Sequence, residues 1–179
     1  MKAIPKTLSK IQRIEDNSYS LIFHWVQDIS VELSEYKGNH SKSSEDMTWK
    51  PFNPGDKWGQ PWGSGWVRGQ VELDPSFFGK EVFLQFDCGA VETLVQINGE
   101  YQGLFNNVVS EEGTRSNHHT LRIVEEGGAS QKLEILMQIY AGHPCKGTQP
   151  NENRERAGAA KYVKRFKQCG LYLKDEKTE

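Results

Sequence analysis

Short runs of alternating apolar and polar residues within the stretch 58–103 constrain the fold of this chain most. Val67, Val71 and Leu73 are separated by polar residues, and the run 82–86 repeats the alternation. Successive side chains of a β-strand point to opposite faces, so alternation of this kind indicates strands with one buried face. The stretch therefore predicts consecutive antiparallel strands.

The remaining strand signals extend this pattern along the chain. Asn98-Gly99 follows the alternating run 93–97 and predicts a type I′ hairpin, because both turn residues then need positive φ. Leu133 to Ile139 shows the cleanest alternation, and residues 170–174 form the last strand candidate. Several short strands in a chain of 179 residues predict a mainly β fold with one core, an antiparallel jelly-roll β-sandwich.

Other parts of the chain predict helix or loop. Residues 7–36 predict a helical segment, because their apolar side chains recur at spacings of three and four: Ile22, Trp25, Val26, Ile29, Leu33 and Tyr36. Their β-branched residues weaken this prediction, and a strand through residues 20–26 is the alternative. The polar stretches 37–46 and 105–119 predict exposed connections.

Composition and charge exclude several classes of protein. The net charge of −2 and a charged fraction of 26% do not favour nucleic acid as a partner. No apolar run is long enough to cross a membrane, and the N-terminus lacks the apolar core of a signal peptide. Three cysteines without a CxxC pair predict reduced thiols in a cytoplasmic protein rather than a disulfide framework.

The chain shows no catalytic or metal-binding pattern. Its acidic residues fall mostly on strand exteriors and in turns, so no catalytic residue is predicted. His118 and His119 would point to opposite faces of a strand, and His143 beside Cys145 lacks further ligands, so no metal site is predicted. The basic run 154–167 predicts a solvated face or a domain–domain contact.

Three tryptophans are the candidate carbohydrate-binding residues. Trp58, Trp62 and Trp66 lie in a segment rich in Gly and Pro, and exposed indole faces suit the C–H faces of a pyranose. Tryptophans are usually buried, and the alternative is that these three pack into the core and pin an irregular loop.

Several motifs, in this order, resemble the N-terminal domain of α-mannosidases of glycoside hydrolase family 38, closest to its cytosolic, vacuolar and bacterial branch. They are Trp66-Val67-Arg68, Asp74-Pro75, Gly79–Val82, Glu92–Gly99, Gln102-Gly103, the strand 133–140 with Ala141-Gly142-His143, and Cys169–Leu173. The chain departs from the family after Gly103, where a longer loop is implied.

The resemblance implies the activity of a larger protein. Family members are zinc-dependent retaining α-mannosidases whose HxD motif lies in a following catalytic domain, and this chain contains no HxD motif. The resemblance therefore implies a non-catalytic domain without its own cofactor, with zinc held by the catalytic domain. Implied partners are that catalytic domain, a mannoside and further copies in a homo-oligomer.

The predicted organisation has three parts. Residues 1–46 form a helical segment and linker, residues 47–174 a jelly-roll sandwich like galactose-binding domains, and residues 175–179 a charged tail at the boundary to an absent catalytic domain. The first functional hypothesis is a domain that packs on the catalytic domain of an α-mannosidase or supports assembly. The second is a free-standing carbohydrate-binding β-sandwich.

Overall fold

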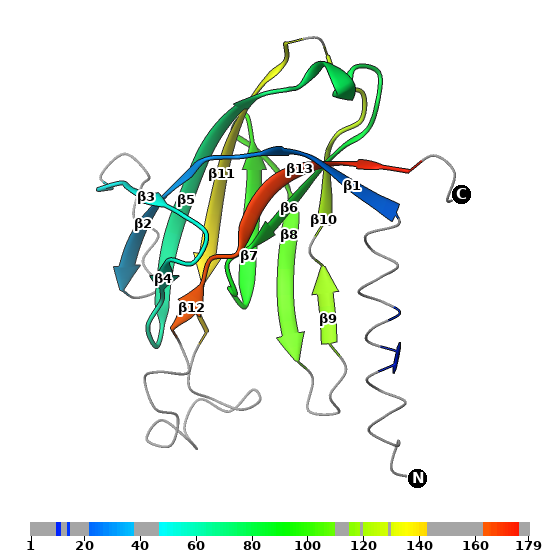
Figure 1. Ribbon diagram of the computed structural model, residues 1–179. Coiled ribbons are helices and arrows are strands. Elements are labelled where there is room, and N and C mark those ends of the chain that lie inside the picture. Colours follow the sequence, from blue (N-terminus) through cyan, green and yellow to red (C-terminus); the bar gives the residue numbers. More distant parts are fainter. Residues whose placement is uncertain are drawn as a thin grey trace.

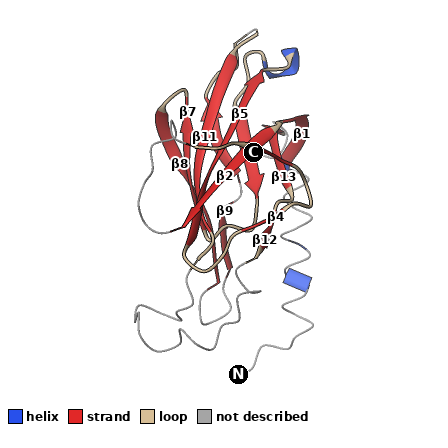
Figure 2. Ribbon diagram, turned by 90° about the vertical axis from the view of Figure 1, so that its left-hand side faces the viewer, coloured by secondary structure: helices blue, strands red, loops and turns tan. Residues whose placement is uncertain are grey.

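Two antiparallel sheets packed face to face make up the molecule (Figures 1 and 2). The structure is a computed structural model that describes residues 10–11, 14, 22–37, 47–109, 115–118, 120–128, 130–142 and 163–175. Strands dominate the described part, and a 3₁₀ turn, η2 (Pro75–Phe77), lies at one end of the sheets. The prediction of a mainly β, antiparallel jelly-roll sandwich is confirmed.

The two main sheets have different widths. The four-stranded sheet has the order β1 (Phe23–Asp28), β13 (Gln168–Lys174), β6 (Val82–Asp87), β10 (Thr120–Val124). The seven-stranded sheet has the order β3 (Lys50–Phe52), β2 (Val31–Lys37), β5 (Gly63–Glu72), β11 (Lys132–Tyr140), β7 (Glu92–Ile97), β8 (Glu100–Val109), β9 (Arg115–His118). A small ribbon pairs β4 (Lys57–Trp58) with β12 (Lys164–Arg165).

The core lies between the two sheets and follows the predicted alternation. On β11 the buried side chains are Leu133, Ile135, Met137 and Ile139, none more than 2% exposed. β11 pairs with β5 on one side and β7 on the other, which makes it a central strand. The alternating residues of β5, β6 and β7 supply further core side chains, among them Val67, Leu84 and Val95.

The Asn98-Gly99 hairpin is confirmed. Asn98 has φ 52° and Gly99 has φ 82°, the positive values that a type I′ turn requires. Asn98 also accepts a hydrogen bond from the Glu134 N–H through Oδ1 (2.8 Å), and this contact ties the turn to β11.

The helix predicted over residues 7–36 is wrong for residues 23–36, which form β1 and β2, whereas the described residues 10, 11, 14 and 22 are helical. β1 belongs to the four-stranded sheet and β2 to the seven-stranded sheet, so the chain changes sheets at Ile29-Ser30. A bulge at Val26 also shifts the register of β1. These two irregularities space the apolar side chains by three or four residues, and the spacing resembles that of a helix. Segment 1–46 therefore contributes strands to the sandwich.

The polar stretch after Phe105 also differs from its prediction as a loop. β8 continues to Val109, and β9 pairs with it at residues 115–118. Phe105 is buried and lies opposite Thr93 on β7. Cross-strand pairing with β7 up to Asn106, and with β9 beyond it, thus extends a segment whose own polar composition indicates exposure.

Candidate functional site

Two of the three tryptophans proposed for sugar binding are buried, on different parts of the fold. Trp58 on β4 is 3% exposed, and its indole N–H donates to the Cys88 carbonyl oxygen at 2.7 Å. Trp66 is 8% exposed and lies between Ser34 and Gln138 on the outer face of the seven-stranded sheet. Trp58 thus has the loop-pinning position that was the alternative prediction.

Trp62 is the half-buried member of this group. Its φ of 62° is unusual for a non-glycine residue, and its backbone N–H donates to the Gly142 carbonyl oxygen at 3.0 Å. The structure therefore does not bring Trp58, Trp62 and Trp66 together as one exposed platform. Sugar binding by these side chains stays a prediction.

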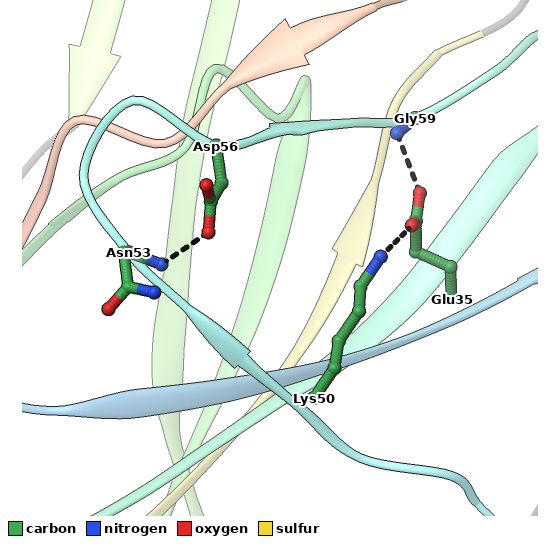
Figure 3. Close-up of polar contacts among 5 residues, drawn as sticks. All are labelled: Glu35, Lys50, Asn53, Asp56 and Gly59. Carbon is green, nitrogen blue, oxygen red and sulfur yellow. Dashed lines mark hydrogen bonds and ion pairs between the residues drawn. The ribbon is translucent and has the colours of Figure 1, made fainter.

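A carboxylate on β2 secures the loop that leads to Trp58 (Figure 3). Glu35 accepts the Gly59 N–H through Oε1 (2.8 Å) and pairs with Lys50 Nζ through Oε2 (3.0 Å). At the tip of the loop, Asp56 Oδ2 accepts the Asn53 N–H at 2.8 Å. These contacts hold an irregular segment against the edge of the seven-stranded sheet.

An open groove of about 1140 Å³ has walls from both main sheets. Four of its polar lining side chains contact one another in pairs: Arg68 Nε and Glu32 Oε2 are 2.7 Å apart, and Gln70 Nε2 is 3.3 Å from Glu134 Oε1. The Arg68 guanidinium also stacks over Trp49 at 4.3 Å from the ring centroid. These pairings fit a role in holding the outer face of the sheet together.

The cysteines described by the structure are buried thiols. Burial raises the pKa of Cys88 to about 12, and burial likewise raises the pKa of Cys169. A thiol in such surroundings is unreactive near neutral pH. Cys145 lies outside the described residues.

Within the described part of the chain, no group of three or more His, Cys, Asp or Glu side chains could hold a metal ion. The same part contains no helix long and apolar enough to cross a membrane. His118 has only its backbone described, and His119 and His143 lie outside the described residues, as does most of the basic run 154–167. The described end of that run packs on the domain: Lys167 Nζ is 2.8 Å from Asp87 Oδ2.

Sequence reasoning missed an aromatic row on the outer face of the four-stranded sheet. Trp25 pairs with Tyr172, and Tyr172 pairs with Phe83, across β1, β13 and β6. Trp25 is 56% exposed, far more than Trp58 or Trp66. Burial, with the nearby charge of Asp28, raises the pKa of the Tyr172 phenol. The period-two spacing of Phe23 and Trp25 signals this face, but the predicted helix hid it.

Comparisons with known proteins agree with the fold. A family model described as "Alpha-mannosidase, jelly roll domain" matches residues 24–173, which include strands of both main sheets. No curated protein matches the chain.

Solved structures with a similar fold include β-glucuronidases. The chain superimposes on one from Faecalibacterium prausnitzii with a TM-score of 0.53 at 10% identity, covering 87% of this chain and 32% of that one. For one from Bacteroides uniformis the TM-score is 0.47 at 12% identity, covering 84% and 17%. The chain thus spans less than a third of either structure, and the likeness to the first, at 10% identity, concerns the fold alone.

The family model covers most of the chain and extends from β1 to β13. It confirms the resemblance to an N-terminal α-mannosidase domain that the motifs indicated. The chain belongs to the family of alpha-mannosidase jelly roll domains.

Proposed function

We propose that this chain is the non-catalytic N-terminal domain of a cytoplasmic α-mannosidase of glycoside hydrolase family 38. In this proposal the domain packs on the catalytic domain or supports subunit assembly. The catalytic domain holds zinc and hydrolyses α-mannosides. The observation that carries the proposal is the family match over residues 24–173.

Exposed apolar side chains on both outer faces support a packing role. On the seven-stranded sheet, Leu94 and Leu104 lie opposite each other on β7 and β8, and both are exposed, as is nearby Tyr101. On the four-stranded sheet, Trp25 is exposed. Apolar side chains that gather on an outer face suit contact with another domain or subunit.

Activity measurements test the proposal. The chain alone should not hydrolyse an aryl α-mannoside, with or without zinc. A version extended through the downstream coding sequence should hydrolyse it and lose activity when zinc is chelated. An extended protein that is folded, loaded with zinc and inactive on α-mannosides would contradict the proposal.

The second candidate is a carbohydrate-binding module, and the partial exposure of Trp62 favours it over a purely structural role for all three tryptophans. Titration of mannose and mannobiose into the labelled chain, followed by NMR, tests this candidate. Shifts of the Trp62 indole signal that disappear in Trp62→Ala are the expected result. Unchanged spectra at millimolar sugar would remove it.

A further inference from the structure

One cross-strand row of side chains spans the outer face of the whole four-stranded sheet. Trp25 on β1 lies opposite Tyr172 on β13, Tyr172 opposite Phe83 on β6, and Phe83 opposite Arg122 on β10. Directly opposed residues of antiparallel strands share a face, so three aromatic side chains stand next to one another. Phe23 adds a fourth, edge-on to Phe83 with ring centroids 5.1 Å apart.

We call Phe23, Trp25, Phe83 and Tyr172 the aromatic face. The next row of the sheet makes room for it, because Gly170 lies directly under the Trp25 indole. A Cβ at Gly170 would lie 3.2 Å from Trp25 Nε1 and 3.3 Å from Cδ1, tighter than almost all real contacts of this kind. Absence of a side chain there lets the indole rest against the backbone of β13.

The Trp25 indole is exposed even though it is held in place. Its exposed fraction is 56%, and among the described residues its N–H has no hydrogen-bond partner. A large apolar ring with an unused donor is typical of interface positions, where Trp and Tyr are enriched.

Charged side chains border the aromatic face: Asp28 lies near Tyr172, and Arg122 and Lys167 form ion pairs within the domain. Arg122 contacts Glu81 and lies 3.3 Å from Glu125, while Lys167 pairs with Asp87 at 2.8 Å. An apolar centre with a charged, solvent-accessible border is the anatomy of a protein–protein interface. The partner that suits it is an apolar protein surface with one hydrogen-bond acceptor for the indole N–H.

The end of β13 lies beside this face. β1 and β13 are neighbours, shown in blue and red in Figure 1. Past β13, the Asp175 N–H donates to the Ile22 carbonyl oxygen at 2.7 Å, and the Asp175 carboxylate lies 3.3 Å from His24 Nε2. Because Lys174 lies opposite Phe23, a domain tethered through Asp175 would have a high effective concentration at this face.

We propose that the aromatic face is the surface on which the domain that follows β13 docks, with Trp25 at the centre of the contact. This inference rests on the proposed function, because that function supplies the following catalytic domain. The exposed apolar pair on β7 and β8 lies on the other sheet, away from the point where the chain leaves, and serves as the internal comparison.

Hydroxyl-radical footprinting with mass spectrometry tests the proposal. The oxidation rate of Trp25 should be several-fold lower in the protein extended through its downstream domain than in this chain alone. Tyr101, which is 68% exposed on the other sheet, should be oxidised at similar rates in both proteins. Equal oxidation of Trp25 in the two proteins would overturn the proposal.

Two further footprinting measurements test whether another molecule covers the aromatic face. Protection of Trp25 in the isolated chain that grows with protein concentration would mean a second copy covers the face. Protection on addition of mannobiose would mean a sugar covers it. Either result overturns the docking proposal.

A matched pair of variants supplies an independent readout. Trp25→Ser should lower the thermal inactivation temperature of the extended protein by clearly more than it lowers the unfolding midpoint of the isolated chain, because the isolated chain buries only the part of the ring that is not exposed. Tyr101→Ser should leave both unchanged. Equal effects of Trp25→Ser in both proteins would show an intradomain role and overturn the proposal. An extended protein without mannosidase activity but with Trp25 protected would contradict only the proposed function.

Discussion

Trp58 donates its indole N–H to the carbonyl oxygen of Cys88 over 2.7 Å, and both residues are almost fully buried. The bond joins β4, on an irregular loop, to the residue that follows β6. It explains how a loop rich in glycine and proline is held to the end of the sandwich. It also explains why this position holds a tryptophan, because another large apolar residue would fill the space but could not donate this hydrogen bond.

Trp58→Phe should lower the free energy of unfolding by about 1–3 kcal/mol, because it leaves a buried carbonyl without its donor. Chemical denaturation followed by circular dichroism measures the change. Trp25→Phe is the control, since its ring is exposed, and should change stability by less than about 0.5 kcal/mol. Equal stabilities of Trp58→Phe and the parent would show that the bond contributes nothing.

Gly127→Ala should destabilise the fold by at least about 1–3 kcal/mol. A Cβ at Gly127 would lie 2.2 Å from the carbonyl oxygen of Phe77, whose ring is fully buried. Gly128→Ala is the matched control, because its Cβ meets only the Gln131 side chain, at 3.4 Å. Thermal melts of both variants measure the difference, and a Gly127→Ala protein as stable as Gly128→Ala would contradict the prediction.

The two buried thiols should resist alkylation. In Cys145→Ser the remaining cysteines are Cys88 and Cys169, so a thiol reagent at pH 8 should label neither in the folded protein. Addition of guanidinium chloride should expose both. Mass spectrometry counts the adducts, and rapid labelling without denaturant would show that the sandwich opens locally.

The Cys88 thiol also predicts a pH dependence. Its pKa rises from 9.0 to about 12 on folding, so the folded state holds this proton more tightly than the unfolded state. The resulting stability is complete below pH 9 and is lost as the pH rises toward 12. Between pH 8 and 10 the parent should therefore lose about 1 kcal/mol more than Cys88→Ala. Urea titrations at the two pH values measure the stability of each protein, and equal losses of stability in the parent and in Cys88→Ala would contradict this prediction.

Glu35→Ala should loosen the loop shown in Figure 3, because Gly59 and Lys50 both lose their acceptor. The expected cost is about 1 kcal/mol, with faster limited proteolysis between residues 50 and 59. Glu92→Ala removes an exposed carboxylate on β7 and is the control. Identical proteolysis of the two variants would assign the loop's order to its aromatic contacts, such as the Phe52–Phe166 stack at 4.4 Å.

Strands with regular alternation could be predicted from the sequence, because their burial pattern is local. β11 and the Asn98-Gly99 turn are examples, and both match the structure. β1 and β2 could not, because their apolar spacing is set by a bulge at Val26 and a change of sheet at Ile29-Ser30. Both features depend on partners distant in the sequence.

The candidate site shows the same division between what the local sequence indicates and what depends on distant parts of the chain. The sequence singled out Trp58, Trp62 and Trp66 because they lie close together along the chain. Whether each is buried depends on the other elements that cover it in the fold. Trp58 is covered, whereas Trp25 lies on an outer sheet face. The period-two spacing of Phe23 and Trp25 indicates a shared strand face, but no local pattern shows which side chains another element covers.

By itself, then, the sequence determined the sandwich class and the α-mannosidase family, because alternation, turn residues and ordered motifs are written along the chain. The tertiary structure alone decided which indoles are hidden and which are presented. Trp25, Tyr172 and Phe83 are far apart in sequence and become neighbours only when β1, β13 and β6 pair. The rings lie in one row because of the register between these strands, and that register depends on parts of the chain that are distant in the sequence.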